Sequence, residues 1–221
     1  MSIGAAPFAA ITSTAQLFNG NIGGMLVNVS KLGKPNLYGY QYDQLNRIVR
    51  MDAFTGLNPE TNGFTTAPLK IEDYHEAITY DPNGNIQTYL RNGDSRSIAM
   101  DKLGNNYVPN TNKLNHVTDT VTMATPFDYR DIKNQSPDNY AYDPIGNLTS
   151  DNQEGISKIE WTVYGKIQKI SKANGTVIRY SYDPGGNRIS KILTTATSAI
   201  SDDSTYYVRD ASGNVMSNKN C

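Results

Sequence analysis

The sequence predicts an all-β fold built from repeated antiparallel hairpins, and three observations predict it. Tyrosines such as Tyr180 and Tyr182 recur at alternate positions, so they share one face of an extended strand. Runs such as the Asp-Pro-Gly-Gly-Asn that begins at Asp183 follow the tyrosines, and turns favour these residue types. No stretch shows the sustained apolar spacing of an amphipathic helix, so helix is expected to be minor.

The segment Arg179–Ile192, RYSYDPGGNRISKI, illustrates how one hairpin is encoded. The Asp183 carboxylate can accept hydrogen bonds from backbone amides two residues further on. Gly185 and Gly186 are expected to supply positive φ angles in the turn. Residues 188–191 should then pair antiparallel with the tyrosine strand. One short segment therefore predicts strand, turn and strand.

The same pattern recurs at a period of about twenty residues or a multiple of it, which indicates a repeat architecture. Weaker copies surround Gly104 and Gly165. We interpret the shared positions as a structural signature of repeated hairpins. These positions are Tyr40, Tyr42, Asp43 and Asn46; Tyr80, Asp81, Gly84 and Asn85; Tyr140, Tyr142, Asp143, Gly146 and Asn147; Tyr180, Tyr182, Asp183, Gly186 and Asn187; and Asp210, Gly213 and Asn214.

The repeat region is expected to span residues 17–217. Residues 1–16 before it are expected to be a frayed or fragment N-terminus, and residues 218–221 a truncated C-terminal end. Three stretches inside the region are rich in Gly, Pro, Asn, Thr or Ser and lack alternation, so we expect loop insertions on the surface. They lie near 51–73, 118–139 and 193–205.

The composition fits a sheet better than a thick apolar core. Hydrophobic residues make up 38% of the chain, and Tyr outnumbers Phe by 15 to 5. Tyrosine combines an apolar ring with a polar tip, which suits a sheet wetted on one face. The net charge is −1 with both signs spread along the chain, and there is no long apolar run. We therefore expect neither nucleic-acid binding nor a membrane span.

The Tyr-Asp pair followed by Gly-Asn, as in ITYDPNGNIQTY and YAYDPIGNLTS, resembles the YD repeat of rearrangement-hotspot (Rhs) proteins. These proteins are relatives of bacterial toxin-complex C components and of teneurins. The resemblance covers about Leu17 to Met216, and stretches such as YGYQYDQLNRIV are similar to versions found in Bacteroidetes. It implies a hollow β-shell of spiralling hairpins, often closed around a C-terminal toxin domain, in a parent protein that is secreted or at the cell surface.

A self-cleaving protease element is the sharpest catalytic alternative. The Asp-Pro-Ile-Gly of Asp143–Gly146 superficially resembles the element near the self-cleavage site of many Rhs proteins. Here Asn147 follows it, and Tyr140 and Tyr142 precede it, so it lies inside a regular repeat. Turn chemistry accounts for every residue, and we interpret Asp143 as structural.

Metal binding and nucleophilic catalysis are also disfavoured. Asp81, Asn83 and Asn85 alternate like calcium ligands, but Ile86 and Asn92 stand where a calcium loop requires Gly and an acid. Other single residues do not change this interpretation: they are His75 and His116, which lack partners at ligand spacing, the terminal Cys221, and Trp161, which occupies the strand position of the repeat. We expect no catalytic residue, metal or cofactor.

The sequence thus favours a non-enzymatic wall segment of an Rhs-type shell. Its expected partners are further YD repeats of the same or parent polypeptide and an encapsulated toxin domain, with self-association through exposed strand edges. The alternative is a cell-surface adhesion or carbohydrate-binding repeat. Rings buried against neighbouring hairpins favour the wall, whereas a groove of exposed rings with flanking Asn and Asp favours sugar binding.

Overall fold

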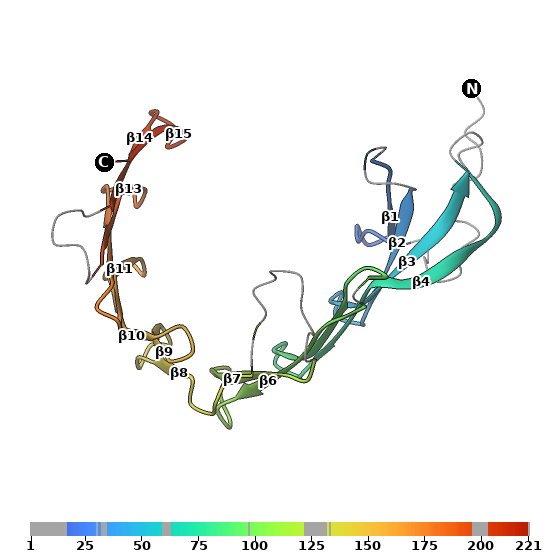
Figure 1. Cartoon of the computed structure of the whole chain (residues 1–221), viewed down its shortest axis with the longest axis horizontal. Helices are drawn as coiled ribbons and strands as arrows, with labels where there is room; N and C mark the ends of the chain where they lie inside the picture. The colour runs from blue at the N-terminus through green and yellow to red at the C-terminus, as the bar shows by residue number, and fades with distance from the viewer. Residues whose placement is uncertain are drawn as a thin grey trace. The chain divides into compact units, whose positions relative to one another are not determined.

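The computed structural model describes residues 17–29, 31, 35–58, 63–96, 98–121, 132, 134–195 and 203–220. Every regular element in these ranges is a β-strand, so the prediction of an all-β fold of antiparallel hairpins is confirmed (Figure 1). Within the same ranges no helix has the length and apolar character that crossing a bilayer requires. The expected frayed segment 1–16 and Cys221 lie outside the described residues.

The strands form two antiparallel sheets in which neighbours along the chain are neighbours in space. The seven-stranded sheet has the order β1 (Gly24–Val27), β2 (Asn36–Tyr42), β3 (Ile48–Asn58), β4 (Gly63–Tyr80), β5 (Ile86–Asn92), β6 (Ala99–Tyr107) and β7 (Leu114–Asp119). The eight-stranded sheet contains β8 (Tyr140–Tyr142), β9 (Leu148–Asp151), β10 (Ile156–Trp161), β11 (Ile167–Lys172), β12 (Val177–Tyr182), β13 (Arg188–Thr194), β14 (Asp203–Arg209) and β15 (Val215–Asn220).

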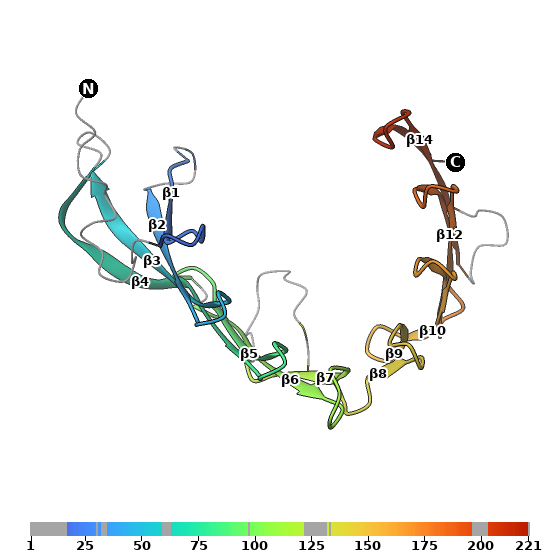
Figure 2. The ribbon, with the colours of Figure 1, turned by 180° about the vertical axis from the view of Figure 1, so that it is seen from behind.

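The chain divides into two compact units, residues 1–106 with 117–134, and residues 107–116 with 135–221. In each unit the chain runs as a meander, so successive connections fall at alternate ends of the strands. The short turns of the repeat signature therefore collect at one end of each sheet, which we call the turn edge. Figure 2 shows the turns of the eight-stranded sheet projecting on the same side of their strands.

A β-bulge precedes each signature turn. In six hairpins the register shifts just before the residue that precedes the turn, for example between Gln41 and Tyr42, and between Ser181 and Tyr182. A bulge bends the strand and re-aims the side chain beside it. The residue before each turn is thus placed differently from the other side chains of its strand.

The hairpin predicted for residues 179–192 is confirmed, with one exception. Strands β12 and β13 pair antiparallel, with Tyr180 opposite Lys191 and Tyr182 opposite Arg188. Gly186 has φ +79°, but Gly185 does not have the positive φ we expected. A turn of this length needs only one left-handed residue, at the position before its closing asparagine.

The prediction of a loop insertion near 51–73 is wrong for the residues described. Strand β3 continues through Asn58 and β4 begins at Gly63, so only 59–62, which lie outside the described residues, separate two long strands. Gly56, one of the turn-favouring residues of this stretch, has φ +101° at a register shift between Thr55 and Leu57. It occupies a bulge inside a strand, where a glycine is favoured.

The other two expected insertions are only partly described. Between β7 and β8, residues 120, 121, 132 and 134–139 are not strand. In the stretch 193–205, residues 193–194 end β13 and 203–205 begin β14, while 196–202 lie outside the described residues. The segment 218–220, expected as a truncated end, belongs to β15.

Few apolar side chains are fully buried. In the first unit Leu37 and Phe54 form the buried cluster, with Leu26 packed against it. Charged groups are buried as well: Asp52 accepts hydrogen bonds from Arg50 Nε at 2.7 Å, and His75 Nδ1 lies 2.9 Å from its Oδ1. Hairpin-to-hairpin contacts, rather than one large core, must therefore hold each sheet together.

Candidate functional site: the turn edge of the hairpins

Each signature turn is closed by its own aspartate. In the turn 183–187, the Asp183 N–H donates to the Asn187 carbonyl at 3.0 Å, and the Gly186 N–H donates to the Asp183 carbonyl at 2.9 Å. The Asp183 Oδ1 accepts from the Asn187 N–H at 2.8 Å, while Asn187 Nδ2 donates to Oδ2 at 3.1 Å. Backbone and side chain therefore form one clamp across the turn.

The other copies repeat this clamp. Asparagine closes it at Asp81–Asn85, Asp143–Asn147 and Asp210–Asn214, with side-chain bonds of 2.8, 2.9 and 3.0 Å. Arg47 closes the first copy instead, with its Nε 2.6 Å from Asp43 Oδ2. The residue before the closing position has positive φ in every copy; these residues are Asn46, Gly84, Gly146, Gly186 and Gly213.

The hydrogen bonds of the clamp favour the charged form of each aspartate. The Asn85 side-chain N–H holds the pKa of Asp81 below its ordinary value, and the Asn187 backbone N–H does the same for the pKa of Asp183. These carboxylates are ionised acceptors committed to their own turns. They are poorly placed to act as catalytic acids.

The residue before each turn ties that turn to the preceding one. The Tyr42 hydroxyl donates to the Ile22 carbonyl at 2.9 Å, and the Tyr80 hydroxyl to the Ile48 carbonyl at 2.8 Å. In the second unit, Tyr142 donates to Leu114 at 3.0 Å and Tyr182 to Ile167 at 2.8 Å. Except for Ile22, each acceptor begins the strand that leaves the preceding turn.

Other residue types make the same kind of bond. Trp161 Nε1 donates to the Leu148 carbonyl at 2.8 Å, and Arg209 Nε to the Arg188 carbonyl at 3.2 Å. In the hairpin of β6 and β7 the residue before the turn is Tyr107, but Asn105, two residues earlier in β6, donates through Nδ2 to the Ile86 carbonyl at 2.9 Å. We call these seven bonds the turn ladder. What the position requires is a donor of sufficient reach, because a carbonyl must be satisfied at each step.

Two cations reinforce the ladder at turns that lack a closing asparagine. The Arg47 guanidinium lies 4.4 Å from the centre of the Tyr80 ring and 3.4 Å from the Asp81 carbonyl. Lys113 Nζ lies 5.8 Å from the centre of the Tyr142 ring and 3.3 Å from the Asp143 carbonyl. Both cations reach from one turn to the ring and carbonyl of the next.

The structure distributes the signature residues over separate turns and does not gather them into one site. Tyr40, Tyr140 and Tyr180 lie two residues before the ladder tyrosines and are half-buried. The described residues hold no group of three or more His, Cys, Asp or Glu side chains that could bind a metal. The sequence reasoning missed the ladder acceptors and the cations at the turn ends. The only signal for the cations was the recurrence of Arg or Lys where other copies have Asn.

The fold and its turn edge define a class, namely antiparallel hairpin-repeat proteins. No family model and no curated protein matches the chain. Similar solved structures include TcdB2–TccC3 with Cdc42 (12% identity), TcdB2–TccC3 (13%) and the Tc holotoxin pore of Photorhabdus luminescens (14%), each with a TM-score of 0.41. Each match covers 90% of this chain and 9% of that chain. Likeness at this level does not establish a common fold.

Proposed function

We propose that the chain is a non-enzymatic structural segment that forms part of the wall of an Rhs-type shell, which encloses and delivers a C-terminal toxin. Its partners in this proposal are further YD hairpins of the same or parent polypeptide, and the enclosed toxin domain. The parent protein would be secreted or at the cell surface. The exposed edges of the outer strands give a further route to self-association.

The observation that carries the proposal is the turn ladder. It fastens each hairpin to its predecessor at the turn edge, through a hydrogen bond from a side chain to a backbone carbonyl. Such nearest-neighbour bonds suit a wall built by repetition, because each unit needs contact only with the next. The aspartates are consumed in turn closure, which supports a structural role for the signature.

The partial burial of the ladder tyrosines favours the wall over a general carbohydrate-binding repeat. Tyr42, Tyr80, Tyr142 and Tyr182 are all half-buried, and their hydroxyls donate within the protein. A repeat that bound sugars at every turn would present these rings and hydroxyls to the ligand. Their engagement in the ladder leaves them poorly suited to that task.

Protease protection of the complete gene product tests the proposal. The full polypeptide would be digested, and the digestion compared with that of any segment encoded after Cys221, expressed alone. We expect the attached segment to survive at protease levels that destroy the free one, and electron microscopy to show a hollow particle. Equal digestion of the attached and free segments, or particles without an interior, would overturn the proposal.

A further inference from the structure

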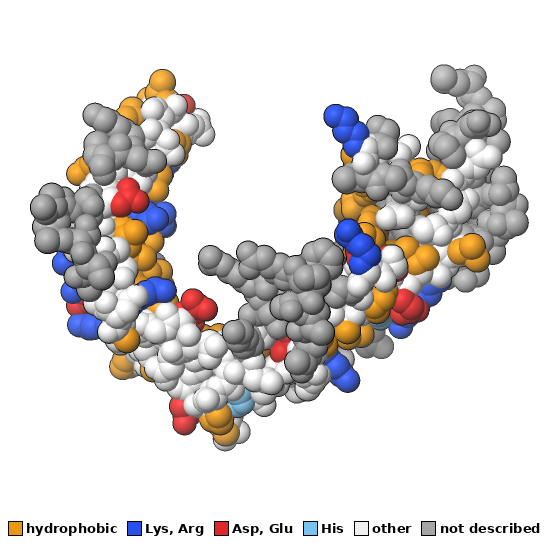
Figure 3. All heavy atoms as spheres, in the orientation of Figure 1, with side chains coloured by type: hydrophobic (Ala, Val, Ile, Leu, Met, Phe, Trp, Pro, Cys, Tyr) orange, Lys and Arg blue, Asp and Glu red, His pale blue; other side chains and the backbone are white. Residues whose placement is uncertain are grey.

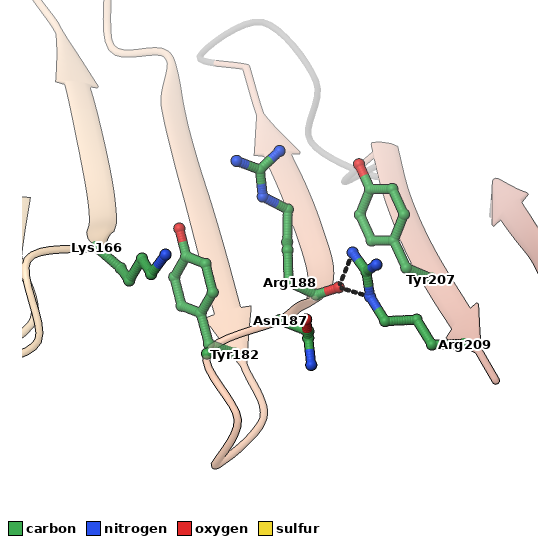
Figure 4. A pocket seen from close by; sticks show the side chains of 7 residues that line it. Lys166, Tyr182, Asn187, Arg188, Tyr207 and Arg209 are labelled. Atoms are coloured by element: carbon green, nitrogen blue, oxygen red, sulfur yellow. Dashed lines mark hydrogen bonds between the residues drawn. The ribbon is translucent and has the colours of Figure 1, made fainter. Parts of the chain in front are cut away.

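Two adjoining hollows lie on the turn edge of the second unit. The smaller, of about 350 Å³, is lined by the cations Lys166, Arg188 and Arg209, together with Tyr182 and Tyr207 (Figure 4). Among the residues that the structure describes, no Asp or Glu side chain lines it. Cations that face one hollow without a carboxylate favour an anionic occupant.

The larger hollow, of about 800 Å³, shares Lys166 and Tyr182 with the smaller one. It lies between the turns 162–166 and 183–187, and Tyr180 and Gln168 also line it. Its one acid, Asp183, is held by the clamp of its own turn. The two hollows share lining residues, so we treat them together as one groove. Within it the Arg188 guanidinium lies 4.4 Å from the centre of the Tyr180 ring, and Arg209 donates to the Arg188 and Gly213 carbonyls. Figure 3 shows Lys and Arg side chains beside hydrophobic ones on this sheet.

Lys166 stands apart from the two cations at equivalent turn ends. Arg47 and Lys113 each lie over the next tyrosine and contact the next aspartate carbonyl. Lys166 closes its turn through its backbone N–H, which donates to Thr162 Oγ1 at 3.1 Å. Its ammonium has no hydrogen-bond or ion-pair partner among the described residues. The turn ladder therefore does not use this charge.

An exposed aromatic residue stands at the rim of the groove. Tyr164, at the tip of the turn 162–166, is 86% exposed, whereas Tyr180 and Tyr182 in the groove are half-buried. A large aromatic side chain that packs against almost nothing at a turn tip makes little contribution to the fold. Beside a groove of further tyrosines, it suits the flat apolar face of a sugar ring.

We propose that this groove binds an acidic glycan, with a sugar ring against the exposed Tyr164 and the anionic substituent at Lys166, beside the guanidinium groups of Arg188 and Arg209. The Gln168 amide supplies a donor and an acceptor for sugar hydroxyls. The anion is a carboxylate or a sulfate, because both accept charge-assisted hydrogen bonds from Lys and Arg. This inference is independent of the wall proposal.

A nucleic acid fits the observations less well. Single-stranded nucleic acid also combines aromatic stacking with cations, but it carries a charge at every nucleotide and needs a basic track along its length. The three cations here line one small hollow, and the net charge of the chain is −1. A glycan with charges at intervals matches a single cationic cluster better.

Calorimetric titration of the full chain tests the inference. The probes are an oligogalacturonate, its methyl ester as the neutral match, a sulfated chondroitin oligosaccharide, and an oligo-dT strand. We expect binding of the uronate or the sulfated probe, weakening with added salt. Lys166→Gln and Tyr164→Ala should each weaken it by about tenfold. The control is Tyr206→Ala: Tyr206 pairs with Ser190, on the face opposite Tyr180 and Tyr182, and is 47% exposed.

The outcomes separate the possibilities. Binding of the uronate alone identifies the anion as a carboxylate, and binding of the sulfated probe alone identifies it as a sulfate. Equal affinity for the methyl ester, equal or tighter binding of oligo-dT, an equal loss in Tyr206→Ala, or no binding at millimolar probe would each overturn the inference. Circular dichroism of each variant would show that the sheet is intact.

Discussion

Trp161 Nε1 donates to the Leu148 carbonyl at 2.8 Å, which is the bond that the Tyr182 hydroxyl makes with the Ile167 carbonyl one hairpin further on. An indole and a phenol thus perform the same task at equivalent positions. Because two different aromatic side chains make the same hydrogen bond, we expect the stability of each hairpin to depend on the donor group as well as on the ring.

Replacing Trp161 with Phe removes this donor while keeping an aromatic ring. Because the Leu148 carbonyl loses its partner, we expect unfolding in urea to show a loss of about 1 kcal/mol. Trp161→Tyr, which restores a donor of the kind used elsewhere in the ladder, should recover part of that loss. Equal stability of the Phe and Tyr variants would show that the ring alone matters.

The turn glycines are expected to be difficult to replace. Gly84, Gly146 and Gly186 have φ angles of +90°, +95° and +79°, and a β-branched side chain is strained there. Changing any of them to Val should cost more than about 1 kcal/mol in thermal or urea unfolding. Asn110→Gly is the control, because the exposed Asn110 has φ +61° in the turn 108–113 and glycine adopts that angle without strain, so it should lose little. An unchanged melting temperature for Gly146→Val would remove the turn interpretation.

Acid should destabilise the turns. The folded-state pKa values of Asp81, Asp183 and Asp210 are lowered. Their contribution to the free energy of unfolding is therefore full above the unfolded pKa of about 4, and it is lost as the pH falls through the lower folded values. Urea midpoints measured between about pH 3 and pH 7 should fall on the acid side. Asp183→Asn should make that fall shallower; an identical acid dependence in the variant and the parent chain would contradict this prediction.

Asp143 is expected to be structural and not a cleavage residue. Its Oδ1 accepts from the Ile145 and Asn147 N–H groups at 3.0 and 2.8 Å, and its Oδ2 accepts from Asn147 Nδ2. The purified chain and Asp143→Asn should therefore show the same intact mass after prolonged incubation. Fragments that end near residue 143 in the parent chain and vanish in the variant would establish autoproteolysis.

Gly104 is required by close packing. A Cβ there would lie 2.8 Å from Thr118 Oγ1, and Thr118 Oγ1 donates to the Gly104 carbonyl at 3.2 Å. We expect Gly104→Ala to destabilise the first unit, and Thr118→Ala to relieve much of that cost in the double variant. The coupling in a double-mutant cycle measures this, and strict additivity would contradict the close approach.

The sequence predicted local features better than distant ones. The turn at Asp183 could be predicted because its aspartate, glycine and asparagine act on one another within five positions. The bond from Tyr80 to Ile48 could not, because its partners belong to different hairpins and strand lengths vary between copies. Residue type was also a poor guide to the ladder, since Asn105 and Arg209 share with tyrosine only the ability to donate.

The two local errors have related causes. Gly185 follows Pro184 in the turn, but only Gly186 takes a left-handed conformation. The mixture of Gly, Pro, Asn and Thr in 51–73 suggested a connection, yet Gly56 in this stretch forms a bulge inside a long strand. Glycine indicates that the backbone departs from regular geometry, but it does not show whether the departure is a turn or a bulge.

Hydrogen exchange of Tyr182→Phe tests the central claim most directly, namely that the residue before each turn fastens its hairpin to the preceding one. The Tyr182 hydroxyl contacts the Ile167 carbonyl, so the account predicts faster amide exchange in both the turn 162–166 and the turn 183–187, with β14 and β15 little changed. Tyr206→Phe, on the opposite face, should leave both turns protected. Unchanged protection in Tyr182→Phe, or a loss confined to its own turn, would contradict the ladder.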